Sequence, residues 1–182
     1  CVLLGMCGLS VAKDIARKIV RPDSADRESA SGKIILLGEH AAVYGRPAIA
    51  LPIPLAVEAS VRKLSSASNK GIKVIIPRWG VEQKVVPQAP GIPGIMAQLI
   101  HNLDLSEEAM TIEVFPNVPK AMGLGGSSAL AVAIIKALNK TYELALKDAE
   151  INTLAYKCEQ TAHGQASGVD NTVATYGVPL FY

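Results

Sequence analysis

The sequence predicts an α+β domain that follows a short helical segment and a linker. Patterns typical of strands come early, between residues 33 and 115, whereas the two long helical patterns follow residue 125. A chain of 182 residues is long enough to bury a sizeable core, and 49% hydrophobic with 19% charged residues is typical of a folded protein. No internal repeat or low-complexity tract interrupts the chain.

The first 31 residues are expected to form a leading helix and a linker. Residues 2–20 repeat apolar side chains at a helical spacing, and residues 21–31 are polar, contain a proline and carry mixed charge. The compact domain is therefore expected to span residues 32–182. Because the chain starts with Cys1, it is expected to be processed or cut from a longer one. Its apolar start lacks a basic leading segment and is too short to span a bilayer, so a packed or partner-facing helix is expected there.

Five segments are expected to be strands. Residues 33–38 form an apolar run that ends in glycine, and residues 55–64 alternate apolar and polar side chains in part. Residues 72–77 and 81–86 flank an Arg-Trp-Gly turn and are expected to form a hairpin. The fifth strand is expected at residues 110–115.

Three segments of the domain are expected to be helices. A short one, residues 95–103, follows a loop rich in proline and glycine. Residues 129–144 repeat apolar side chains at a helical spacing, and residues 147–164 do the same and end in glycine. No regular element is expected in residues 165–177, which read QASGVDNTVATYG.

Charge and cysteine content narrow the class of partner. A net charge of +2 is too small to indicate nucleic acid or an acidic membrane surface as the main partner. Cys1, Cys7 and Cys158 follow no metal-ligand spacing and cannot all pair with one another. A reduced, cytoplasmic setting is the expected one.

A glycine-rich loop precedes the longest helical pattern, and residues 117–138 read NVPKAMGLGGSSALAVAIIKAL. Glycines let backbone amides converge, and a helix N-terminus adds a positive end, so this segment is suited to binding a phosphate without any lysine. The hydroxyls of Ser127 and Ser128 would contact phosphate or Mg²⁺. The Walker pattern is absent because no Gly-Lys-Ser/Thr closes the loop. Taken alone, the segment fits an ordinary glycine turn with a serine cap equally well.

Charged residues flank the first expected strand. Lys33 precedes the apolar run, and Glu39 and His40 follow it. Such residues are usually solvated or structural. A Gly-Glu-His sequence at the exit of a strand can, however, direct its side chains into a cleft.

A third cluster, residues 159–171, reads EQTAHGQASGVDN. Glu159 and His163 lie four residues apart on one helical face, and Asp170 follows beyond two glycines and close to Ser167. Two carboxylates near a phosphate loop suit separate roles, because one can hold a metal ion while the other orients or deprotonates a hydroxyl. Taken singly, a surface glutamate and an aspartate turn are the alternatives.

Together the three motifs resemble the superfamily of small-molecule kinases that includes galactokinase, homoserine kinase, mevalonate kinase and phosphomevalonate kinase (GHMP). Within it, the segments GKIILLGEHAAVYGRPAIA and HGQASGVDN are most similar to the mevalonate kinases. The resemblance runs from about residue 32 to residue 177 and favours phosphate binding by the glycine loop. It implies an N-terminal domain with a ribosomal-protein-like sheet of four or five strands, backed by helices and containing a left-handed βαβ crossover.

The resemblance also implies ATP- and Mg²⁺-dependent phosphorylation of the 5-hydroxyl of mevalonate, a step of isoprenoid precursor synthesis. Asp170 resembles the acid that accepts or orients the hydroxyl proton, and Lys33 resembles the lysine that stabilises its charged form. The phosphate cradle is expected at Gly123, Leu124, Gly125, Gly126, Ser127 and Ser128. The metal is expected at Ser128 and Glu159. Substrate contacts or support of the site are expected from Glu39, His40 and Ser167.

The sequence departs from the superfamily pattern in three respects. Ala121 replaces a glycine of the loop, and Gly126 is an extra residue before the serines. Val178 stands where a second glycine is common. The third glycine-rich motif of the superfamily, which lies in a C-terminal domain, does not occur in this sequence, so a fragment without that domain is expected.

Two alternatives therefore stay open for the function. The chain would be a sister kinase acting on another small alcohol or on phosphomevalonate, or a catalytically silent binding or regulatory fragment. Mevalonate is the expected small-molecule partner, a homodimer is considered, and neither nucleic acid nor a membrane is expected.

Overall fold

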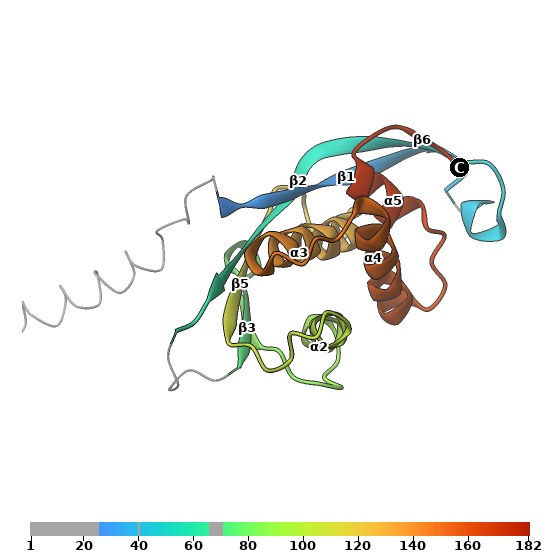
Figure 1. The fold of residues 1–182 in the computed structure, drawn as a ribbon. Helices are drawn as coiled ribbons and strands as arrows, with labels where there is room; N and C mark the ends of the chain where they lie inside the picture. The colour runs from blue at the N-terminus through green and yellow to red at the C-terminus, as the bar shows by residue number, and fades with distance from the viewer. Residues whose placement is uncertain (1–25, 40, 66–70) are drawn as a thin grey trace, which may run out of the picture.

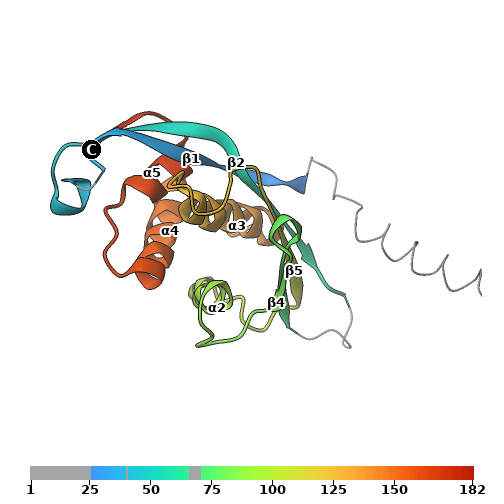
Figure 2. The same ribbon diagram turned by 180° about the vertical axis from the view of Figure 1, so that it is seen from behind.

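A computed structural model describes residues 26–39, 41–65 and 71–182 of the chain. The leading helix expected over residues 2–20 lies outside these ranges. The described part has the α+β architecture that the sequence predicts. One mixed sheet curves around four helices, which all lie on its concave face (Figures 1 and 2).

The described part of the sheet has six strands: β1 (Glu28–Leu37), β2 (Ile49–Lys63), β3 (Ile72–Ile76), β4 (Val81–Lys84), β5 (Met110–Pro116) and β6 (Leu180–Phe181). Their order is β1-β2-β5-β3-β4, and β6 pairs with the start of β2. Neighbouring strands are antiparallel except for β3 and β5, which are parallel. The resemblance implied four or five strands, and the two-residue β6 is the addition. The handedness of the crossover between β3 and β5 stays a prediction.

The helices are α2 (Ile92–Asn102), α3 (Gly126–Tyr142), α4 (Asp148–His163) and α5 (Val169–Tyr176), with short 3₁₀ turns η2 (Ala41–Tyr44) and η3 (Pro77–Trp79). The central helix is α3, which packs on β1 and β2 and also contacts α4 and α5. Ten of its residues are buried, and four of these are alanines, which let the neighbouring elements approach closely. The core therefore fixes the start of α3, directly after the glycine loop.

The first strand begins earlier than the sequence predicts. Glu28 already pairs with Ala59 of β2, and Ser29 pairs with Glu58. The boundary predicted between residues 31 and 32 is therefore wrong, because the last four residues assigned to the linker belong to the sheet.

The second strand also begins earlier, at Ile49 and not at residue 55, although it contains Pro52 and Pro54. Proline removes a backbone donor, so it is expected at unpaired edges. In the described part of the sheet, β2 pairs with β6 only up to Ala50 and with β5 only from Val57, so one of its edges is open between them. The prolines lie in this interval.

A further helix, α5, forms where no regular element was expected. Its buried face consists of Val169, Asn171, Val173, Ala174 and Thr175. The other expected strands and helices are confirmed, with ends shifted by a few residues. No helix in the described ranges is both long and apolar enough to cross a bilayer.

Candidate active site

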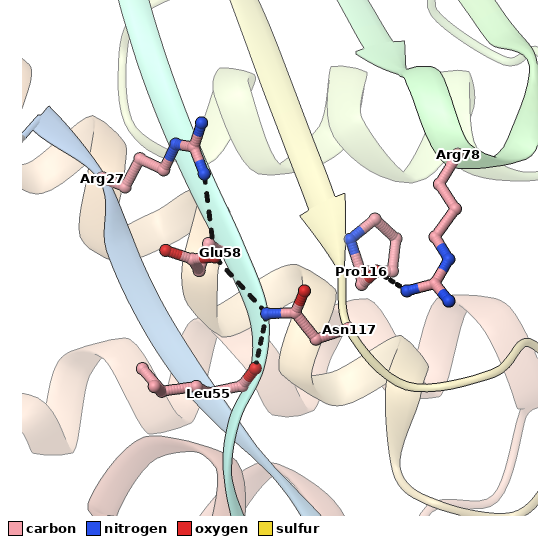
Figure 3. Close-up of polar contacts among 6 residues, drawn as sticks. All are labelled: Arg27, Leu55, Glu58, Arg78, Pro116 and Asn117. Atoms are coloured by element: carbon pink, nitrogen blue, oxygen red, sulfur yellow. Dashed lines mark hydrogen bonds and ion pairs between the residues drawn. The ribbon is translucent and has the colours of Figure 1, made fainter. Parts of the chain in front are cut away.

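The glycine-rich loop connects β5 to α3, and its start is fastened to the sheet (Figure 3). The side-chain amide of Asn117 donates a hydrogen bond to the carbonyl of Leu55 at 2.9 Å, and it lies 3.4 Å from the carboxylate of Glu58. Beside it, Arg78 donates to the carbonyl of Pro116 at 3.0 Å. These bonds fix the point at which the chain leaves β5.

The end of the loop is held by β1. The backbone N–H of Lys33 donates to the carbonyl of Leu124 at 2.9 Å. This close approach requires glycine on both sides. A Cβ atom on Gly32 would lie 2.6 Å from the Leu124 oxygen, and one on Gly125 would lie 2.8 Å from Cγ of Lys33. Gly125 also has a φ of 69°, which side chains disfavour.

Free backbone amides gather at the start of α3. The first helical bond runs from the N–H of Ala129 to the carbonyl of Gly125. The N–H groups of residues 125–128 donate to no backbone carbonyl of the described chain. Such unpaired donors, together with the positive end of the helix dipole, form a site for an anion. The described chain therefore leaves these amides without a backbone acceptor, as phosphate binding requires.

The two serines of the loop have different surroundings. The hydroxyl of Ser127 donates to Oε1 of Glu159 at 2.8 Å, whereas Ser128 is fully buried and its hydroxyl has no partner in the described structure. Successive helical residues point about 100° apart, so only one of the two can face α4. Ser127, and not Ser128, therefore lies beside Glu159 in the described structure. The assignment of Ser128 and Glu159 to a metal stays a prediction.

Asp170 lies in the first turn of α5 and faces Lys33 of β1. Nζ of Lys33 is 3.2 Å from Oδ1 of Asp170, and Lys33 is 6% exposed. Burial raises the pKa of Asp170, the charge and hydrogen bond of Lys33 lower it, and the charges of Glu159 and Glu39 raise it further. The net effect is a raised pKa, which makes this carboxylate a better proton acceptor than an exposed aspartate.

One cavity of about 420 Å³ brings these groups together. Its polar lining contains Lys33, Glu159 and Asp170 and the loop residues 123–127. Its apolar lining comes from η3, α2 and the start of the loop and includes Trp79, Ile92, Ile95, Met96, Val118 and Met122. The lining of the cavity therefore combines charged and apolar side chains.

The donor set fits a divalent cation that is shared with a phosphate. Glu159 is 9% exposed, and its one partner in the described structure is the neutral hydroxyl of Ser127, so its charge is uncompensated there. The described residues contain no group of three or more His, Cys, Asp or Glu that could hold a metal by themselves. Mg²⁺ is commonly held by one or two protein oxygens together with substrate phosphates, and this arrangement meets that description.

The three residues expected around the substrate have different outcomes. Glu39 is exposed and acts on Asp170 through its charge, and His40 lies outside the described residues. Ser167 accepts a hydrogen bond from the N–H of Val169 at 3.3 Å, so its hydroxyl supports the start of α5. It does not belong to the lining of the cavity.

Sequence reasoning missed the apolar lining of the cavity. Trp79 was assigned only to a turn, and the ammonium of Lys120 lies 5.3 Å from the centre of its ring. Cys158 also lines the cavity, and burial together with the charge of Glu159 raises the pKa of its thiol to about 12. A lone tryptophan in a chain with 4% aromatic residues was the one signal available.

Comparisons with known proteins point to one superfamily of kinases. Residues 93–178 match the family model of the GHMP kinases N terminal domain. A mevalonate kinase of Pyrococcus abyssi is 34% identical over 167 residues, which cover 85% of this chain and 50% of that protein. The chain thus spans about half the length of the curated relatives it matches.

Among the solved structures that share the fold, two mevalonate kinases are 25% and 30% identical in sequence to this chain. The mevalonate kinase of Methanococcus jannaschii has a TM-score of 0.72 at 25% identity, and the match covers 85% of this chain and 52% of that one. The mevalonate kinase of L. major, solved in complex with R-mevalonate, has a TM-score of 0.59 at 30% identity. This match covers 86% of this chain and 51% of that one.

Proposed function

This chain contains a GHMP kinase N-terminal domain, and on that premise we propose that it phosphorylates the 5-hydroxyl of mevalonate with ATP and Mg²⁺. One observation carries the proposal: the free amides at the start of α3, the Ser127–Glu159 pair and the Asp170–Lys33 pair line a single cavity. The similarity to mevalonate kinases, one of them solved with R-mevalonate, supports this choice of substrate. The reaction belongs to isoprenoid precursor synthesis.

In this proposal the glycine loop binds the phosphates of ATP. The amides of residues 125–128 donate to the phosphate oxygens, and the positive end of α3 favours their charge. The bond between Lys33 N–H and Leu124 keeps the loop in this conformation before ATP arrives. Preorganised donors of this kind stabilise charge without reorganising during the reaction.

Ser127 and Glu159 would hold a magnesium ion. When bound, this ion would neutralise negative charge on the phosphates. Transfer is expected to be direct, because phosphoryl transfer depends on positioning and charge stabilisation and requires no covalent enzyme intermediate. The apolar side chains that line the same cavity would exclude water from the reacting groups.

Asp170 accepts or orients the proton of the acceptor hydroxyl in this mechanism. Its raised pKa brings it closer to neutrality, where a general base is most effective. Lys33, 3.2 Å away, keeps a positive charge beside the carboxylate and beside the oxygen on which negative charge develops. Asp170 therefore accepts or orients the hydroxyl proton, and Lys33 stabilises the negative charge that develops on the acceptor oxygen.

Replacing Asp170 with asparagine tests the assignment. Asn keeps the shape of the side chain but cannot accept the proton, so turnover should fall by about 10²–10⁴, the usual contribution of a general base. Binding of ATP, measured by calorimetry, should be largely unchanged because the amides of α3 remain. Asp148→Asn is the matched control, since Asp148 is an exposed acid on α4. Normal turnover by the Asp170 variant would refute the role.

Two further measurements separate the alternatives. A substrate panel with coupled detection of ADP distinguishes mevalonate from phosphomevalonate and other small alcohols. Calorimetry with ATP on the 182-residue chain distinguishes a nucleotide-binding domain from a silent one. Binding of ATP with no turnover of any alcohol would favour a regulatory role for this chain.

A further inference from the structure

Two tyrosine hydroxyls hold consecutive carbonyls of the segment just before Asp170. Tyr156, on α4, donates to the carbonyl of Ala166 at 3.2 Å. Tyr182, which follows β6, donates to the carbonyl of Ser167 at 2.6 Å. The two tyrosines come from different elements and reach the same short loop.

Both tyrosines are themselves fixed in place. The backbone of Tyr182 exchanges two hydrogen bonds with Ala48, from N–H to carbonyl at 2.9 Å and in return at 3.1 Å, so it extends the pairing of β6 with β2. The ring of Tyr156 lies against Gly168, where an added Cβ would be 3.9 Å from it. The loop is thus tied to the sheet on one side and to α4 on the other.

The loop needs such ties because its sequence does not restrain it. Gly164 and Gly168 bracket it, and both have positive φ angles, 79° and 88°. Glycine has more backbone conformational freedom than any other residue in unfolded and locally open states, so ordering it costs more entropy. The loop ends where α5 begins, and the hydroxyl of Ser167 accepts the N–H of Val169, one residue before Asp170.

We propose that Tyr156 and Tyr182 are positioning residues, which fix residues 164–168 and thereby set the carboxylate of Asp170 against Lys33. We call the two hydroxyl bonds, from Tyr156 to Ala166 and from Tyr182 to Ser167, the tyrosine clamp. Its effect on turnover rests on the proposed function, whereas its effect on the loop does not. Neither tyrosine lines the cavity. They act through the loop and through the first turn of α5.

The expected consequence is a loss of turnover without a loss of nucleotide affinity. The tyrosine clamp bonds the loop that leads to Asp170. In the described part of the chain, neither of its two hydrogen bonds involves the glycine loop. Loss of one hydrogen bond is expected to lower kcat about tenfold, which corresponds to about 1.4 kcal/mol. The KM for ATP should stay within about twofold, a change of less than half a kcal/mol.

Tyr156→Phe and Tyr182→Phe remove one hydroxyl each and keep the ring. Tyr176→Phe is the matched control, because Tyr176 has the same 42% exposure as Tyr182 and its hydroxyl makes none of the hydrogen bonds of the described residues. Hydrogen exchange of the peptide covering residues 164–172 should be about tenfold faster in the two clamp variants and unchanged in the control. Thermal midpoints report whether any variant has lost global stability.

The two measurements fail independently. If exchange in residues 164–172 is unchanged in both clamp variants, the clamp does not hold the loop and the proposal is overturned. If exchange rises but kcat equals that of Tyr176→Phe, the positioning of Asp170 is overturned. Should the parent chain phosphorylate no alcohol, the proposed function fails, and the exchange measurement alone decides whether the two hydroxyls fix the loop.

Discussion

Replacing Gly32 with alanine should displace the glycine loop from β1. The added Cβ would lie 2.6 Å from the carbonyl oxygen of Leu124 and 3.0 Å from Cβ of Ala56. An ordinary carbon–oxygen contact is about 3.3 Å, so the loop must move by about 0.7 Å. Neither neighbour can rotate away, because one is backbone and the other is a methyl group on a buried strand residue.

The cost can be estimated from these contacts. Overpacking of this kind costs about 1–3 kcal/mol. A shift of about 0.7 Å would also break the 2.9 Å bond between Lys33 N–H and Leu124, which contributes about 1 kcal/mol. Alanine offsets about 0.4–1 kcal/mol by restricting the unfolded chain. The net loss is about 2 kcal/mol, or a fall of about 4–8 °C in thermal midpoint for a chain of this size.

Thermal and urea unfolding followed by circular dichroism measure this loss. Gly126→Ala is the matched control for stability, because its nearest neighbour would be Cγ2 of Val118 at 3.9 Å and its φ is not positive. That variant should be at least as stable as the parent. Binding of ATP to Gly32→Ala, measured by calorimetry, should weaken as the amides of the loop move.

A thermal midpoint of Gly32→Ala within about 1 °C of the parent, a difference of less than 0.5 kcal/mol, would refute the reasoning. It would mean that the loop does not rest on β1 as closely as the Lys33–Leu124 bond indicates. A matching loss in Gly126→Ala would refute it in another way, because the effect would then belong to glycine replacement in general.

Three further results are expected. Ser127→Ala should weaken Mg²⁺-dependent ATP binding about tenfold in calorimetry, whereas Ser128→Ala should leave it unchanged and leave the thermal midpoint equal or higher, since its buried hydroxyl has no partner in the described structure. Lys33→Met removes the group that lowers the pKa of Asp170, so this pKa should rise and the acid limb of the profile of kcat/KM should move to higher pH. A carboxyl whose folded-state pKa is raised loses stability as pH rises from the unfolded value of about 3.9 through the folded value, so thermal midpoints of this variant should fall more steeply over that interval than those of the parent. Burial raises the pKa of Cys158 to about 12, so mass spectrometry after iodoacetamide treatment at neutral pH should find it unmodified in the folded chain and modified after unfolding.

The elements that the sequence predicted are those with a regular apolar period. The strand β3 and the helices α3 and α4 each repeat apolar residues at the spacing of their own structure. α5 carries the same signal in Val169 and Val173, four residues apart, but the glycines before it and its buried polar residues Asn171 and Thr175 concealed it. Burial of the Asn171 side chain depends on a partner on another helix, because its amide donates a 2.6 Å bond to Asn152 of α4.

The three motifs named the charged residues and the loop residues that line the cavity, but the arrangement of these residues depends on contacts between distant segments. Lys33 of β1 meets Leu124 of the loop and Asp170 of α5. No local pattern specifies these distances, because each requires the sheet and helices to be packed. The composition also could not show that Trp79, in the Arg-Trp-Gly turn, lines the same cavity.

The choice between the two loop serines shows this dependence most directly. The sequence Gly-Gly-Ser-Ser offers both hydroxyls to a metal, and a step of one residue turns a side chain by about 100° around the helix. What selects Ser127 is the residue at which α3 begins, and Gly125 sets that point through its left-handed conformation and its contact with Lys33. A strand residue more than ninety positions earlier therefore determines which serine reaches Glu159. If α3 began one residue later, Ser128 would take the place on the helix that Ser127 has now.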